Sequence, residues 1–141
     1  RILQKYFAPV LIGCLMGSLA SMGSAYLLCK AFGLEDALVA TMLPKSVTTP
    51  IAMAVSETLG GIVPVTVAAV ILTGILGAMI APLLIKIFHV TDPIAQGVAI
   101  GTCSHAIGTT KAMELGELQG AMSSIAIGVA GLMTVLISLF L

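Results

Sequence analysis

Two stretches of this sequence place lysine, serine and threonine between long apolar segments. The first is Leu-Pro-Lys-Ser-Val-Thr-Thr-Pro, residues 43–50, and the second is Gly-Thr-Cys-Ser-His-Ala-Ile-Gly-Thr-Thr-Lys, residues 101–111. Each carries a lysine and a Thr-Thr pair beside helix-breaking residues. Polar and ionisable groups at membrane depth are costly, so they usually face a cavity and carry function. These two stretches are therefore the candidate functional site.

The chemistry of both stretches suits a small carboxylate, including one that carries a hydroxyl group. A helix broken inside a membrane leaves backbone groups that need a partner, and the N-terminal end of a half-helix favours an anion. Lysine adds full positive charge, and hydroxyl and imidazole groups add donors. The candidate substrate-binding residues are Lys45, Ser46, Thr48, Thr49, Ser104, His105, Thr109, Thr110 and Lys111. A cation site would need carboxylates within the breaks, whereas Glu57, Glu114 and Glu117 follow a turn or more later.

Each of these assignments has a structural alternative. His105 either couples transport to a proton, since a histidine titrates near neutral pH, or holds two helices together as a neutral hydrogen-bonding group. Lys45 and Lys111 either contact substrate or form ion pairs with Glu57 or Glu114. The Thr-Thr pairs either bind substrate, cap the broken helices, or do both.

The positions of the breaks follow from proline and glycine. Pro44 lacks an N–H and clashes with the preceding turn, and Pro50 disfavours helical geometry at the residue before it. In the second stretch Gly101 and Gly108 are the expected helix-breaking residues, with Gly108 marking the interruption.

Composition defines an integral membrane protein of the all-α class. Hydrophobic residues make up 59% of the chain and charged residues 9%, against about 25% charged in a soluble domain. Residues 7–29, 62–85 and 121–141 are each apolar and long enough to span a bilayer. Two shorter elements, residues 37–59 and 94–118, read as discontinuous helices that either cross or re-enter. The expected architecture is a polytopic helical bundle with three full spans and two broken helices, within one transmembrane domain over residues 1–141.

Several smaller features complete the expectation. The two broken elements share a Thr-Thr, Ala-Met and Glu pattern, which suggests an internal repeat and points to a transporter binding site. Gly13 and Gly17 either let another helix approach closely or lie incidentally on a lipid-facing helix. Cys14, Cys29 and Cys103 read as small core residues rather than disulfides or metal ligands. A net charge of zero without a basic run argues against nucleic acid, and no cofactor or metal site is expected.

Enzymatic chemistry has little support. The Gly-Thr-Thr-Lys sequence ending at Lys111 lacks the order and the preceding strand of a phosphate-binding loop. Ser46 with Lys45 or His105 could form a hydrolase dyad, but no Gly-x-Ser-x-Gly surrounds the serine. We therefore expect a protein that is not an enzyme.

At these residues the sequence resembles the LrgB/CidB family of bacterial membrane proteins. The segment LPKSVTTPIAM, residues 43–53, is similar to the most characteristic run of that family. The segment GTCSHAIGTTKAMELGELQGAMSS, residues 101–124, resembles its second signature, in which alanine usually stands at the position of Cys103. The resemblance extends from end to end, and family members are longer at the N-terminus. It implies that this chain corresponds to the C-terminal part of a longer LrgB-like protein.

The resemblance implies two functions. One is transport of small monocarboxylates, as in plastid glycolate/glycerate translocators and bacterial relatives linked to pyruvate. The alternative is an antiholin-like regulator of murein hydrolase export, autolysis and cell death, acting with a small LrgA/CidA-like membrane partner. Either function implies a multi-pass protein of the bacterial plasma (inner) membrane, in contact with the lipid bilayer and assembled as a homo- or hetero-oligomer. The residue chemistry favours transport, because a membrane lesion would not require cationic and hydroxyl groups at two helix breaks.

Overall fold

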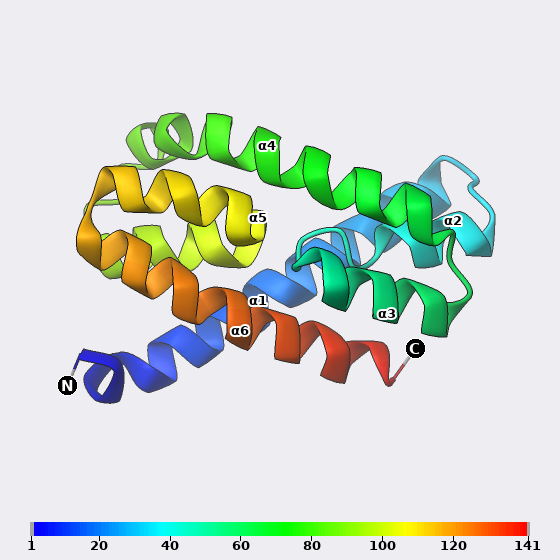
Figure 1. Ribbon diagram of the computed structural model, residues 1–141, viewed down its shortest axis with the longest axis horizontal. Helices are drawn as coiled ribbons and strands as arrows, with labels where there is room; N and C mark the ends of the chain where they lie inside the picture. Colours follow the sequence, from blue (N-terminus) through cyan, green and yellow to red (C-terminus); the bar gives the residue numbers. More distant parts are fainter. Residues whose placement is uncertain (1, 141) are drawn as a thin grey trace.

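The all-α class predicted from composition is confirmed. The computed structural model describes residues 2–140, with side chains from residue 4 onward. Within that range the chain forms six α-helices and no strand (Figure 1). The helices are α1 (Ile2–Ala31), α2 (Asp36–Met42), α3 (Thr49–Leu59), α4 (Val63–Ile87), α5 (Pro93–Leu115) and α6 (Glu117–Ser138).

Three of the described helices are long and apolar enough to cross a membrane. They are α1 over Gln4–Ala31, α4 over Val63–Ile87 and α6 over Glu117–Ser138. At 1.5 Å per residue each of them covers the roughly 30 Å of a bilayer core. These helices correspond to the three spans predicted from the sequence.

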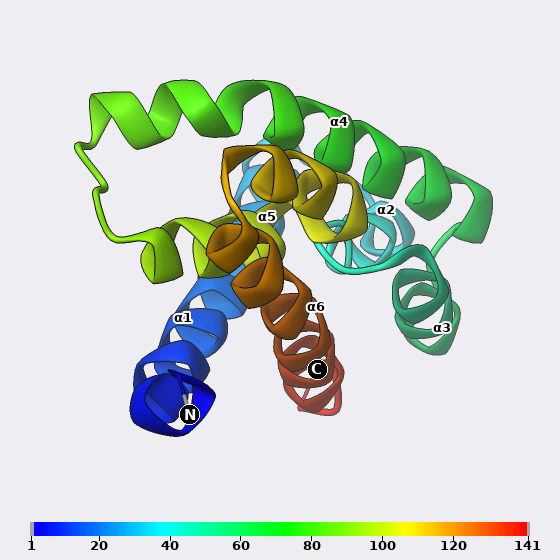
Figure 2. The same cartoon turned by 60° about the vertical axis from the view of Figure 1, so that its left-hand side comes forward.

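The three long helices extend between the same two ends of the molecule, here called the near end and the far end. A cluster of packed side chains marks each end. At the near end, Tyr6 of α1, Ile94 of α5 and Leu118 of α6 pack against one cluster. At the far end, Cys29 of α1 lies in a second cluster, against which Ile137 of α6 packs. Helices α1 and α6 therefore run in the same direction, and α4 returns in the opposite one (Figures 1 and 2).

Helices α2 and α3 form a hairpin that enters from the far end. The chain leaves α2 after Met42, runs through residues 43–48 and comes back along α3. As a result Leu59, at the end of α3, packs beside Val39 and Leu43. In Figure 1 the turn between α2 and α3 points toward the middle of the molecule.

Helix α5 is also a hairpin, and it enters from the near end. Its first half runs parallel to α6, because Gly97 lies against Gln119 and Gly101 lies against Ser123. Its second half runs antiparallel to α6, since Thr109 lies against the same Ser123 and Met113 against Gly120. The reversal occurs at His105, the residue inside α5 with non-helical dihedral angles (φ 43°, ψ −140°).

The length of the second hairpin sets the depth of its turn. Helix α5 has 23 residues with His105 near the centre, so each half of about 11 residues is about 16 Å long. That is about half of the bilayer core, which places the turn close to the midplane if α6 spans. The N-terminal end of α5 is capped, because the Asp92 carboxylate accepts a hydrogen bond from the Ile94 N–H at 3.0 Å.

The glycine pair of α1 is a helix-packing face, one of the two predicted alternatives. A side chain at Gly17 would overlap the Thr102 methyl group, and one at Gly13 would touch Val98. Both contacts are with the first half of α5. The small residues therefore let α1 and α5 approach closely.

Candidate functional site

The first tip, residues 43–48, joins α2 to α3. Helix α2 ends at Met42, just before the buried Pro44, and Pro50 lies in the first turn of α3. Both prolines occupy positions where a missing N–H costs nothing. The break predicted between them is present in the structure.

The first tip carries a lysine that no carboxylate neutralises. Lys45 Nζ donates a hydrogen bond to Ser46 Oγ at 3.3 Å, and Ser46 Oγ in turn lies 2.6 Å from Ser21 Oγ of α1. Ion pairs among the described residues involve Lys30 and Lys111, so Glu57 does not pair with Lys45 there. This half-buried ammonium therefore contacts the Ser46 hydroxyl group rather than a carboxylate.

The predicted capping role of the first Thr-Thr pair is not seen. Thr48 is the N-cap residue of α3, but its side chain makes no capping hydrogen bond. Both Thr48 and Thr49 are half-buried. Their hydroxyl groups stay predicted substrate donors.

The second tip, residues 102–106, is the turn of the α5 hairpin. His105 is 3% exposed, and its Nε2 atom lies 2.8 Å from the carbonyl oxygen of Val70 in α4. A left-handed φ at a non-glycine residue costs about 1–3 kcal/mol and persists when the surroundings fix it. The contact with Val70 is such a constraint and ties the second tip to α4.

The interruption of α5 falls at His105 rather than at Gly108, three residues later. Gly101 and Gly108 are helical, and both are buried. A side chain at Gly101 would overlap the Ser123 carbonyl of α6, and one at Gly108 would overlap Ser104. These two glycines let the halves of the hairpin pack against each other and against α6. They do not break the helix.

Two glycines of α4 receive the second tip. A side chain at Gly74 would meet the His105 ring, and one at Gly77 would overlap the hydroxyl of Ser104. His105 and Ser104 are both buried against α4. The predicted substrate donors of the second tip therefore face protein.

The rest of the second stretch is also satisfied within the protein. Thr109 Oγ1 donates to the His105 carbonyl at 3.0 Å and lies 2.7 Å from Ser123 Oγ. Lys111 Nζ lies 2.8 Å from Glu114 Oε2, which is the ion-pair alternative considered from the sequence. Thr110 is exposed. Among the lysines of the two stretches, Lys45 is the one left without a counter-ion.

The two tips lie side by side. A cavity of about 10 Å³ is lined by Pro44, Ser46 and Val47 from the first tip and by Thr102 from the second. Val47 also packs against the Val70 side chain, while Val70 offers its carbonyl to the second tip. The cavity has room for one water molecule at most, so a carboxylate does not fit between the closed tips.

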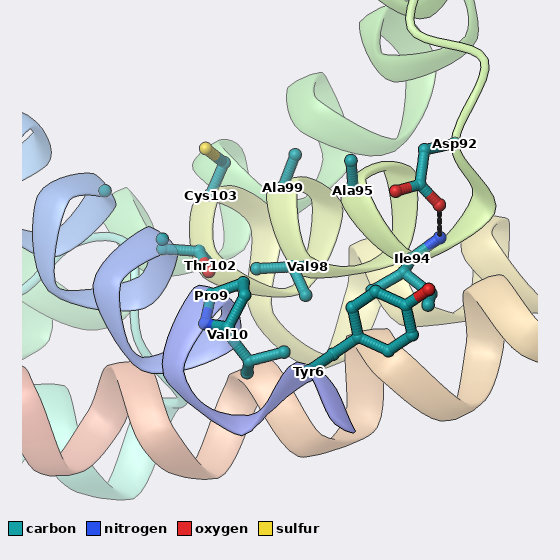
Figure 3. Close-up of a pocket in the computed structure, with 12 residues that line it drawn as sticks. Tyr6, Pro9, Val10, Asp92, Ile94, Ala95, Val98, Ala99, Thr102 and Cys103 are labelled. Carbon is teal, nitrogen blue, oxygen red and sulfur yellow. Dashed lines mark hydrogen bonds between the residues drawn. The ribbon is translucent and has the colours of Figure 1, made fainter. Parts of the chain in front are cut away.

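The open space lies beside the tips, in two grooves that flank the first half of α5. One, of about 370 Å³, lies between α1 and α5 and is lined by Tyr6, Pro9 and Val98 among others (Figure 3). The other, of about 350 Å³, lies between α4 and α5. Cys103 lines both grooves and is exposed, which corrects its prediction as a core residue. Cys14 and Cys29 are buried as predicted.

A polar network at the base of the first hairpin was not predicted from the sequence. Thr66 Oγ1 lies 2.7 Å from Ser56 Oγ and donates to the Thr41 carbonyl at 3.0 Å, and Thr41 Oγ1 accepts from the Ile62 N–H at 2.7 Å. Thr41, Ser56 and Thr66 are fully buried. Such isolated polar residues in apolar helices give no local signal, because their partners come from three different helices.

The serine that meets the first tip did leave a signal. Cys14, Gly17, Ser18 and Ser21 recur at the spacing of one helix face. All four contact other segments through their small or polar groups, with Ser21 reaching Ser46 of the first tip. This face of α1 could have been predicted as a lining of the site.

Fold and site together define a multi-pass helical membrane protein whose polar groups gather where two helical hairpins meet. The chain belongs to the LrgB-like family, which matches residues 1–141. It is thus a multi-pass bacterial membrane protein, as predicted. No solved structure matches the chain.

Two relatives show how far the likeness extends. The chain is 41% identical over 135 residues to the "Antiholin-like protein LrgB" of Bacillus mycoides (strain KBAB4). It is 40% identical over the same length to the protein so named from Bacillus cereus (strain B4264). These matches cover 96% of this chain but 59% of each relative, so the chain spans less than two thirds of their length.

Proposed function

We propose that this chain acts as an antiholin-like membrane protein, the description that its relatives carry. The support is 40–41% identity over 96% of the chain, within a family match that includes both tips. In this role it would modulate murein hydrolase export, and through it autolysis and cell death, together with a small LrgA/CidA-like membrane protein.

At the molecular level we propose that the first tip binds a small monocarboxylate of the glycolate, glycerate or pyruvate type, and that the protein moves it across the membrane. The observation that carries this proposal is Lys45, a half-buried ammonium with hydroxyl neighbours and no carboxylate partner among the described residues. An uncompensated charge in a membrane protein is costly unless a ligand supplies the opposite charge.

The surroundings of Lys45 suit such an anion. The hydroxyl group of Ser46 lies next to it and contacts that of Ser21, and α3 begins one residue beyond Thr48. A helix N-terminus favours negative charge. Two hairpins that enter from opposite ends and meet near the middle of the spans also match the broken-helix sites of secondary transporters.

The two levels of description are compatible. A protein that moves a metabolic acid would change the cell's acid balance, and autolysis would respond to that change. The protein would then regulate autolysis by moving the acid across the membrane rather than by forming a lesion in it.

Uptake by purified protein in liposomes tests the carrier. We expect saturable uptake of labelled pyruvate or glycolate, lowered about 10- to 100-fold by Lys45→Gln, because a hydrogen bond to a charged group contributes about 1.5–3 kcal/mol. Lys111→Gln is the matched control and should retain uptake, because Lys111 already pairs with Glu114. Equal uptake by wild type and Lys45→Gln would exclude a site at the first tip.

Autolysis and murein hydrolase release in a bacterial host test the antiholin-like role. Expression of the wild-type chain should change both, and Lys45→Gln should abolish the change if flux is the cause. If Lys45→Gln still changes autolysis and hydrolase release, the antiholin-like role would stand and would not depend on transport. Leakage of an unrelated dye from the liposomes would instead indicate a pore.

A further inference from the structure

The first half of α5 presents one open face between α1 and α4. Ala95, Ala99 and Cys103 are exposed and spaced four residues apart, and their side chains point to the same side in Figure 3. Ala99 and Cys103 line both grooves, so this face is the ridge at which the two grooves join. Because the side chains of Ala99 and Cys103 are small, this face does not separate the two grooves with bulky groups.

Cys103 is the point where this open face reaches the first tip. Its neighbour Thr102 lines the small cavity together with Pro44 and Ser46. Lys45 Nζ donates a 3.3 Å hydrogen bond to Ser46 Oγ, which places the ammonium beside the small cavity that Ser46 shares with Thr102. The cation of the first tip therefore lies at the inner end of the open face, outside the closed cavity.

We propose that the anion binds on this open face, with its carboxylate at Lys45 and its carbon chain along Cys103 and Ala99. The closed cavity of about 10 Å³ excludes even a two-carbon acid, whereas each groove of about 350–370 Å³ admits one easily. The short apolar wall of Ala99 and Cys103 suits the carbon chain of an acid of two or three carbons. This assignment rests on the proposed anion function and names Cys103 as a binding residue.

Thiol labelling of Cys103 tests the assignment without any need for transport. A methanethiosulfonate reagent transfers its thio group to the cysteine, forming a disulfide and releasing methanesulfinate. Two reagents of similar size, one with an anionic sulfonate and one with a cationic trimethylammonium group, are compared on purified protein in lipid nanodiscs. Mass spectrometry of the intact protein gives both rates, and Cys103→Ala reports any reaction at the buried Cys14 and Cys29.

We expect the anionic reagent to react several-fold faster than the cationic one, with Lys45→Gln removing the preference and Lys111→Gln keeping it. Millimolar pyruvate or glycolate should slow the labelling of wild type but not of Lys45→Gln. A preference that survives Lys45→Gln, or labelling that the acids do not slow, would overturn the assignment. If the acids protect Cys103 from labelling but liposomes show no uptake, the transport function would be wrong and the binding position would stand.

Discussion

The two polar stretches look alike in sequence but differ in how their polar groups are satisfied. In the second stretch His105 and Thr109 find partners on α4 and α6, and Lys111 pairs with Glu114. In the first tip Lys45 donates a hydrogen bond to Ser46, and no carboxylate pairs with it among the described residues. The comparison indicates that the second tip holds the structure together and that the first tip presents charge. Similar residues thus take different roles because their neighbours differ.

The largest expected effect is the loss of stability when the second tip loses its histidine. His105→Ala removes a buried ring and its hydrogen bond to Val70, which should cost about 2–4 kcal/mol of unfolding free energy. Lys45→Gln should leave stability unchanged or raise it slightly, because it removes a half-buried charge that no carboxylate neutralises among the described residues. Unfolding followed by helix content in detergent gives both values.

A second histidine variant tests the same contact if His105→Ala does not fold. His105→Gln keeps a donor for the Val70 carbonyl and should recover part of the stability. If Lys45→Gln were as destabilising as His105→Ala, the distinction between the two tips would be wrong.

The next effect concerns the glycines of the second hairpin. Gly101→Val forces a side chain against the Ser123 carbonyl and should destabilise the protein by about 1–3 kcal/mol. Gly128→Ala is the control in α6, since a side chain there meets nothing within 4 Å and should stabilise the helix by about 0.5–1 kcal/mol. Thermal unfolding of both variants would show whether tight packing holds the hairpin closed.

A smaller effect separates the two threonine pairs. Thr109→Val removes two buried hydrogen bonds and should cost about 1–2 kcal/mol. Thr48→Val removes no capping bond, so stability should change by less than about 0.5 kcal/mol while uptake falls if Thr48 contacts the acid. Unfolding and uptake measured on the same preparations would contradict the comparison if Thr48→Val were the more destabilised protein.

The smallest effect is at the base of the first hairpin. Lys30 donates a 2.7 Å hydrogen bond to Asp36, and this bond and its charge lower the pKa of the Asp36 carboxyl. A lowered pKa stabilises the folded protein above the unfolded value of about 3.9, and that contribution disappears as pH falls through the folded pKa. Asp36→Asn should therefore lower Tm slightly at pH 7 and not at pH 2. An equal difference at both pH values would assign the effect to something other than the ion pair.

Sequence reasoning predicted the spans and the first break because both depend on local chemistry. Apolar length defines a span, and Pro44 and Pro50 leave little choice to the backbone. The break of the second hairpin was misplaced because the chain reverses at His105, whose ring is held by the Val70 carbonyl of α4, a long-range contact that no local pattern reveals. Cys103 was misassigned for a related reason, since the reversal at His105 turns its face toward the grooves.

The two hairpins also decide which charges share a membrane face. Each hairpin begins and ends at the same end of the molecule, so the start of α1 and the finish of α4 lie together. Lys5 and Lys86 then fall on one face and Lys30 on the other. Positively charged residues favour the cytoplasmic side of bacterial membrane proteins, so we expect Lys5 and Lys86 to face the cytoplasm. Alkaline phosphatase, which is active outside the cytoplasm, should accordingly be active when fused after Leu34 and inactive when fused after Val90.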